Sequence, residues 1–141
     1  MYKLIKPMLF QFDPEKAHGM TIDALKFVQN HPKLLPVIKK IFHYENDSLN
    51  QNLKGIHFAN PIGLAAGFDK SCEVPKALEN AGFGSIELGG ITPKPQPGNP
   101  KPRMYRLVED QALINRMGFN NLGMNKALSY LRKHRYQIPV G

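Results

Sequence analysis

The chain has 141 residues, of which 42% are hydrophobic and 21% charged, and these shares exclude a disordered tail or a collagen-like repeat. Its longest stretch without a charged side chain, residues 55–68, is too short for a membrane-spanning helix, which needs about 20 residues. The single cysteine, Cys72, excludes an internal disulfide bond, and the first residues lack the pattern of a secretory signal.

The net charge of +8 is concentrated towards the carboxyl end of the sequence. Residues 1–93 carry 10 basic and 9 acidic side chains, whereas residues 94–141 carry 9 basic and 2 acidic ones. A basic block of this kind favours an anionic partner, such as a nucleic acid, a phospholipid surface or an acidic small molecule. A solvated basic face without a specific partner fits the pattern equally well.

The opening residues predict three short amphipathic helices. Apolar residues up to Phe12 share one helical face, and a second helix begins with Asp13 as its cap and Pro14 in its first position. This second helix ends near Pro32, and residues 34–42 form the third. Three such stripes are too short to bury one another, so we expect apolar surface to remain exposed for a partner.

The middle of the chain predicts a parallel sheet. After a polar linker at 45–52, the apolar residues 62–66 are predicted to form a strand that is buried on both faces. A helix follows at 73–81, a second buried strand at 85–88, and a third strand begins at Ile138. This order indicates an α/β fold with right-handed crossovers.

Other elements are predicted around this sheet. Residues 53–58 form a small hairpin, and residues 103–107 pair with 112–115 in a second one. Five prolines between 93 and 102 predict a stiff extended loop, because proline suits neither a helix interior nor a central strand. A last helix is predicted at 125–134.

The segment Gly63–Lys70 is the first candidate site. Small residues at the carboxyl end of a buried strand let a flat ligand approach the backbone closely, and a lysine at that end can hold a substrate carboxylate. A tight turn with a surface salt bridge explains the same residues equally well. The chain has no glycine-rich nucleotide fingerprint and no P-loop.

Two later segments repeat this chemistry. Gly89 and Gly90 again place small residues after a strand, and the block 115–121 combines three amides and a guanidinium around Gly118. Amides can pair with both donor and acceptor edges of a planar heterocycle, although they also cap helices and form turns. Cys72 fits a small buried hydrophobe better than a nucleophile, and no Cys/His cluster has metal-ligand spacing.

Three ordered blocks carry a resemblance to a known family. Residues 60–70 resemble the first barrel strand of dihydroorotate dehydrogenases, and the blocks 82–100 and 114–120 match the same family in the same order. The opening helices, which contain the segment Phe10–His18, resemble the membrane-associated, quinone-dependent class 2 enzymes.

The resemblance implies an α/β fold that is the amino-terminal part of a (β/α)8 (TIM) barrel preceded by a small helical extension. Residues 1–45 would be the membrane- and quinone-associated extension, and residues 46–141 the first strands and helices of an FMN-binding barrel. Because such a barrel takes about 250 residues, the catalytic base is expected beyond Gly141 and the chain alone is expected to be inactive.

The implied activity is the oxidation of dihydroorotate to orotate in pyrimidine biosynthesis, with FMN as hydride acceptor and a membrane quinone as electron acceptor. A peripheral place on the membrane, facing the cytoplasm in a bacterium, follows from the class, with no nucleic-acid partner and no metal. Two alternatives remain open at this point: an FMN barrel acting on RNA, such as a tRNA dihydrouridine synthase, and a non-catalytic module that docks on a membrane or partner.

The resemblance also implies site residues by position. The family usually has Ser or Thr where this chain has Gly90, so only backbone can meet the flavin there. The residues implied are Ala66, Gly67, Phe68, Asp69, Lys70 and Gly90 for FMN, Lys70, Asn115, Arg116, Met117, Gly118 and Phe119 for the substrate, and His18 and Arg106 for the quinone.

Overall fold

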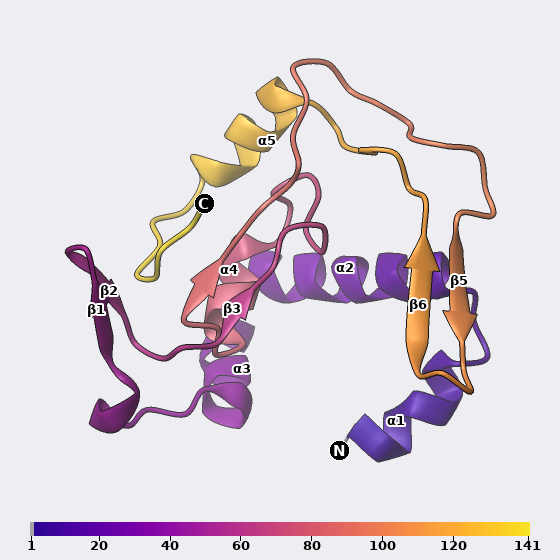
Figure 1. Ribbon diagram of the computed structural model, residues 1–141. Coiled ribbons are helices and arrows are strands. Elements are labelled where there is room, and N and C mark those ends of the chain that lie inside the picture. The colour runs from indigo at the N-terminus through magenta and orange to yellow at the C-terminus, as the bar shows by residue number, and fades with distance from the viewer. Residues whose placement is uncertain (1) are drawn as a thin grey trace.

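The computed structural model describes residues 2–141, which form five α-helices and three separate two-stranded sheets (Figure 1). Two short 3-10 turns, Pro32–Leu34 and Asp47–Leu49, precede α3 and β1. The helices are α1 (Tyr2–Leu9), α2 (Pro14–Asn30), α3 (Leu35–Phe42), α4 (Pro75–Asn80) and α5 (Met124–Leu131). The strands are β1 (Gln51–Leu53), β2 (Ile56–Phe58), β3 (Gly63–Leu64), β4 (Ser85–Ile86), β5 (Met104–Leu107) and β6 (Ala112–Asn115).

The three opening helices are confirmed, with one correction. The Asp13 carboxylate accepts hydrogen bonds from the backbone N–H groups of Glu15 and Lys16, so it caps α2 as its sequence predicts. The first helix ends at Leu9, however, and Phe12 therefore lies in the turn that leads to this cap rather than on the helical face.

The parallel sheet is also confirmed. Strands β3 and β4 pair in parallel, and Ile86 of β4 forms a further parallel bridge with Val140, so the third predicted strand lies beside the second. The predicted double burial of residues 62–66 is wrong, because Ile62 is 62% exposed and only Gly63 and Leu64 form the strand. Within the described residues β3 has a paired neighbour on one edge only, and its Leu64 side chain is partly buried against the core.

Helix α4 begins two residues later than predicted, at Pro75. The Asp69 carboxylate accepts hydrogen bonds from the backbone N–H groups of Glu73 and Val74, both at 2.8 Å, and holds them as a loop before the helix. The polar linker is shorter than predicted as well, since β1 starts at Gln51.

The core lies where α2 and α4 meet the β3–β4 sheet. Ile22, Val74, Leu78 and Ile86 are buried together there. Gln29 of α2 reaches the first turn of α4, where its Oε1 accepts from the backbone N–H of Lys76 at 2.9 Å. Helix α2 is therefore held by both apolar packing and a polar cap on its neighbour.

The β5–β6 hairpin is formed as predicted and rests against α2, while the proline-rich segment before it runs as an extended loop (Figure 1). The last helix, α5, is shorter than predicted and ends at Leu131. Apolar side chains remain exposed on the opening helices, among them Leu4 at 85% and Phe27 at 58%. Within residues 2–141, no helix is both long and apolar enough to cross a membrane.

Candidate functional site

Three loops that follow β3, β4 and β6 enclose a cavity of about 300 Å³, which we call the substrate cavity. It brings together the predicted flavin and substrate residues, except Phe68, Asp69 and Arg116. Its lining consists of Ala66, Gly67, Lys70, Gly89, Gly90, Asn115, Met117, Gly118, Phe119 and Asn120.

Small residues form one wall of this cavity. A Cβ built on Gly67 would have no atom within 4 Å, and one built on Gly90 would meet only the Phe119 ring, at 3.6 Å. The two loops are joined by hydrogen bonds from the Gly67 N–H to the Gly89 carbonyl, at 2.8 Å, and from the Gly89 N–H to the Asp69 carbonyl, at 3.0 Å. A flat ligand can therefore lie directly against their backbone.

Lys70 is the charged group of the substrate cavity; among the described residues that line it, no other carries a charge. Its ammonium donates a hydrogen bond to the Gly67 carbonyl. Burial lowers the pKa of Lys70, and the nearby Glu15 carboxylate opposes this shift while the Arg103 guanidinium adds to it. A half-buried ammonium without a carboxylate in the same cavity is suited to hold an anionic ligand.

Three of the predicted residues do not present their side chains to this cavity. The Asp69 side chain turns to the start of α4 and is 1% exposed, so only its backbone remains near the small-residue wall. Arg116 is exposed, and its Nη2 donates to the Pro102 carbonyl at 3.2 Å. The Phe68 ring lies on the other side of its loop, edge-on to His18.

Asn120 also lines the cavity; the sequence identified it only as part of the amide-rich block 115–121 and not among the implied substrate residues. Its Oδ1 is buried and makes no hydrogen bond with the described residues. The neighbouring Asn121 has a structural role instead, because its amide binds the Phe119 carbonyl and the Gly123 N–H at 2.7 and 2.8 Å. The dense run of amides was a signal for both residues, but it could not separate their roles.

A second cavity, of about 700 Å³, lies between α2 and the β5–β6 hairpin, and we call it the helix-side cavity. It shares Lys70 and Asn115 with the substrate cavity, so the two adjoin. His18 and Arg106, the two residues that the resemblance implies for the quinone, both line it. His18 Nε2 lies 2.7 Å from the Phe68 carbonyl, and the Arg106 guanidinium stands 4.7 Å from the centre of the Phe10 ring.

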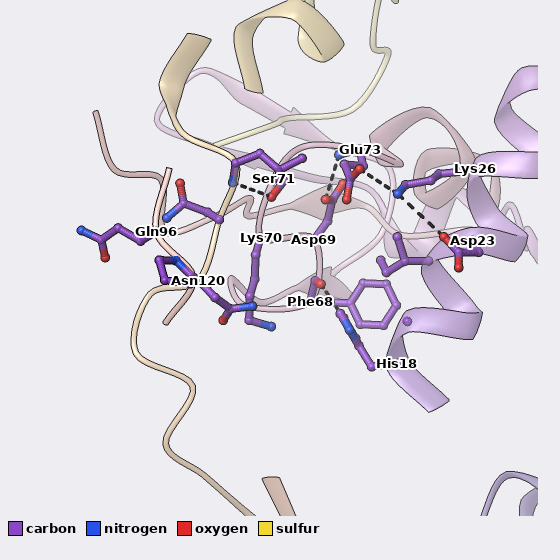
Figure 2. A pocket seen from close by; sticks show the side chains of 15 residues that line it. His18, Asp23, Lys26, Phe68, Asp69, Lys70, Ser71, Glu73, Gln96 and Asn120 are labelled. Carbon is purple, nitrogen blue, oxygen red and sulfur yellow. Dashed lines mark hydrogen bonds and ion pairs between the residues drawn. The ribbon is translucent and has the colours of Figure 1, made fainter. Parts of the chain in front are cut away.

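A third cavity, of about 460 Å³, lies on the other side of the residue 68–71 loop (Figure 2). Lys26 lies there 2.7 Å from Glu73 and 3.8 Å from Asp23, and Lys70 and the buried Asp69 also line this cavity. No group of three or more metal-ligating side chains is found among residues 2–141. Three acidic side chains accompany the two lysines that line the third cavity, whereas no carboxylate side chain among the described residues lines the substrate cavity beside Lys70.

The sequence of this chain is similar to known proteins of one family. The family model for dihydroorotate dehydrogenase matches residues 48–140. A curated relative named dihydroorotate dehydrogenase (quinone) from Roseiflexus sp. is 48% identical over 135 residues, which cover 96% of this chain and 37% of that protein. Another of the same name, from Rhizobium rhizogenes, is 53% identical over 134 residues, covering 94% of this chain and 34% of that protein.

Solved structures give the same result. The crystal structure of DHODH from Eimeria tenella in complex with ferulenol has a TM-score of 0.70 and 43% identity, covering 86% of this chain and 30% of that one. The crystal structure of the ligand-free type of DHODH from the same organism has a TM-score of 0.73 and 38% identity. This match covers 92% of this chain and 36% of that one. The chain thus spans about a third of the length of these relatives. From the family match and these likenesses, the chain belongs to the dihydroorotate dehydrogenase family.

Proposed function

We propose that this chain contributes the flavin and substrate side of an enzyme that oxidises dihydroorotate to orotate and passes the electrons to a membrane quinone. The observation that carries the proposal is the substrate cavity, where Lys70 is the charged lining residue beside a wall of small residues. The relatives' shared name, dihydroorotate dehydrogenase (quinone), supports the same activity. It does not favour an RNA-directed flavin enzyme or a non-catalytic docking module.

The proposed architecture is the opening of a (β/α)8 barrel, with residues 1–45 as its helical extension and 46–141 as its first strands and helices. Support comes from β3, β4 and the Val140 bridge, which lie side by side, parallel and in chain order. A barrel of this type begins with the same arrangement, and its binding groups gather at the carboxyl ends of the strands. Lys70 and Gly90 follow two such ends.

The residues of the substrate cavity fit a flat cofactor and an anionic heterocycle. The open space over Gly67 and the exposed backbone at Gly90 would accommodate the FMN ring, which supplies the acceptor for the hydride of dihydroorotate when bound. Lys70 would hold the substrate carboxylate by a charge-assisted hydrogen bond. The amides of Asn115 and Asn120 supply donors and acceptors for the edges of the pyrimidine ring.

The helix-side cavity is the proposed place for the quinone. Apolar residues such as Leu9 and Leu113 line it, and His18 and Arg106 add polar groups beside them. Exposed apolar side chains on α1 and α3, with Lys39 and Lys40 near the end of α3, suit a peripheral place on an anionic membrane surface. In a bacterium that surface is the cytoplasmic one.

The proposed function is tested in the complete enzyme that contains this chain, by titrating orotate into its FMN-loaded form and following the flavin absorbance. Lys70→Ala should weaken orotate binding by about 1.5–3 kcal/mol, since it removes a charge-assisted hydrogen bond. Lys94→Ala, at an exposed lysine in the proline-rich loop, is the matched control and should leave the affinity unchanged. Equal affinities for Lys70→Ala and the unsubstituted protein would contradict the proposal, as would tight binding of tRNA in place of orotate.

A further inference from the structure

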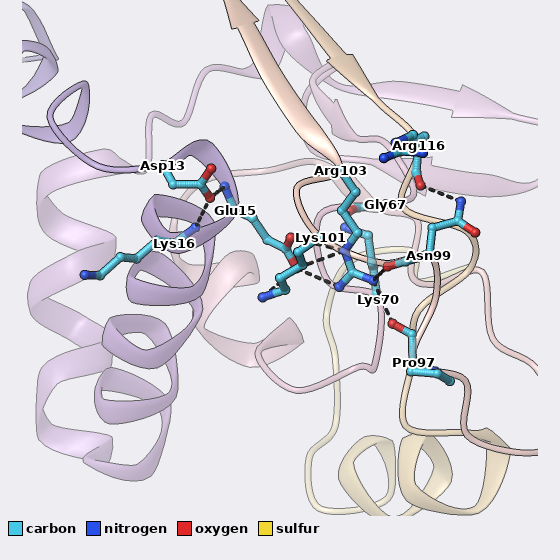
Figure 3. Close-up of polar contacts among 10 residues, drawn as sticks. All are labelled: Asp13, Glu15, Lys16, Gly67, Lys70, Pro97, Asn99, Lys101, Arg103 and Arg116. Atoms are coloured by element: carbon cyan, nitrogen blue, oxygen red, sulfur yellow. Dashed lines mark hydrogen bonds and ion pairs between the residues drawn. The ribbon is translucent and has the colours of Figure 1, made fainter.

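Glu15 and Arg103 form a nearly buried ion pair that joins α2 to the start of β5 (Figure 3). Arg103 is 6% exposed; its Nη2 lies 2.6 Å from Glu15 Oε1, and its Nε lies 3.1 Å from Glu15 Oε2. The hydrogen bond from Arg103 lowers the pKa of Glu15, and the same contact raises the pKa of Arg103. Both groups are therefore charged at neutral pH.

The guanidinium also holds a turn of the proline-rich loop. Arg103 Nη1 donates hydrogen bonds to the carbonyl oxygens of Pro97, at 2.7 Å, and Asn99, at 2.9 Å. Between them, Gly98 has a φ of +75°, and a Cβ there would lie only 2.2 Å from the Met117 carbonyl oxygen. The turn at 97–99 is thus packed directly onto the loop that lines the substrate cavity.

Hydrogen bonds connect this turn to that loop. The Asn99 N–H donates to the Met117 carbonyl at 2.9 Å, and the Asn99 side-chain amide donates to the Arg116 carbonyl at 2.6 Å. The Arg116 N–H donates in turn to the Arg103 carbonyl at 2.8 Å. A continuous path of contacts therefore leads from Glu15 on α2 to Met117 in the substrate cavity.

We propose that Glu15 is a positioning residue for the substrate cavity: through Arg103 and the 97–99 turn it sets the position of the loop 115–119 against Lys70. The proposal rests on the proposed function of that loop in holding the pyrimidine. Stability alone is a poor explanation of the pair, because burying two charges costs about as much as their attraction returns. His18 lies one helical turn beyond Glu15 and lines the helix-side cavity, which adjoins the substrate cavity.

The test compares Glu15→Gln with Lys101→Gln in hydrogen–deuterium exchange and in orotate titration. Glu15→Gln keeps the shape of the side chain but removes its charge, so exchange at the amides of Asn99 and Arg116 should become faster. Orotate affinity should fall by about 3- to 30-fold, the range typical of substitutions along a coupling path, and Tm should fall as well, because the buried Arg103 loses its charged partner. Lys101 contacts the same carboxylate at 3.3 Å but is 70% exposed, and its substitution should change neither readout.

Asn99→Ala provides a second test that leaves α2 and the ion pair intact. Because Asn99 is exposed, its truncation leaves no buried charge and should loosen the 115–119 loop in the same way even if Glu15→Gln does not fold. Faster exchange confined to α2, with unchanged exchange at 112–121 and unchanged orotate affinity, would overturn the proposal. If the unsubstituted protein does not bind orotate, the proposed function fails, whereas the exchange experiment without FMN still decides whether Glu15 positions the loop.

Discussion

The two sides of the loop between β3 and α4 differ sharply although their residues are neighbours in sequence. On the core side, the Asp69 carboxylate is buried and both its oxygens accept backbone hydrogen bonds at the start of α4. On the cavity side, the Lys70 ammonium faces a cavity with no other charged side chain in its described lining. One side of the loop thus satisfies its own polar groups, and the other leaves a charge for a ligand. We expect substitutions on the core side to change stability and substitutions on the cavity side to change binding.

The largest effect is expected at Asp69. Asp69→Ala leaves two backbone N–H groups without their charged acceptor, and it should lower the free energy of unfolding by about 3–4 kcal/mol. Urea denaturation followed by circular dichroism measures this loss, with the exposed Asp110→Ala as control. A variant as stable as the parent would show that the core side of the loop is not a structural cap.

Cys72 lies on the core side of the loop, and its thiol should make the stability of the protein depend on pH. Its side chain is fully buried, and burial, with a smaller contribution from Asp69, raises its pKa to about 11 from an ordinary value of 9.0. A raised pKa means that the folded state holds the thiol proton more tightly than the unfolded state does. The contribution of this thiol to the free energy of unfolding is therefore present in full below pH 9 and is lost as the pH rises to 11.

The expected loss is about 2–3 kcal/mol across that interval, at about 1.4 kcal/mol for each pKa unit. The measurement is the urea midpoint between pH 8 and pH 11 for the protein and for Cys72→Ala. The variant should lose less stability than the parent over this range. Parallel curves for the two proteins would mean that the thiol is not protected by the core.

A smaller effect is expected at Gln29 of α2, whose side chain accepts hydrogen bonds from the first turn of α4. Gln29→Ala removes the acceptor of the Lys76 and Ala77 N–H groups and the donor to the Glu73 carbonyl. The free energy of unfolding should fall by about 1–2 kcal/mol, while orotate affinity should stay unchanged. Gln51→Ala, at an exposed position of β1, is the control. If Gln29→Ala changed orotate affinity but not stability, the core side and the cavity side of the loop would not differ in the way described.

Much of the fold follows from local patterns. Asp13 and Pro14 predict the start of α2, and the order of apolar segments predicts the parallel pairing of β3 with β4. The exposure of Ile62 could not be predicted, because a continuous apolar run indicates what a strand can bury but not how many neighbours cover it.

The site divides in the same way. Lys70 was predicted from its place after a strand of small residues. The opposite directions of Asp69 and Lys70 depend on where α4 lies, and no local pattern contains that information. Glu15 was visible only as an acidic residue in the first turn of a helix, because its partner Arg103 is 88 residues away. Long-range polar contacts of this kind leave no periodic signal in a single sequence.

The position of α2 also has a consequence for the order of folding. Its partners come much later in the chain: the carbonyl bound by Gln29 belongs to Glu73, 44 residues on, and the guanidinium bound by Glu15 lies 88 residues on. A helix of 17 residues is only marginally stable alone, so its apolar face stays exposed during synthesis until α4 and β4 have left the ribosome, and its ion pair with Arg103 forms later still. Contacts of such long sequence separation close slowly, and the docking of α2 is therefore expected among the last steps of folding.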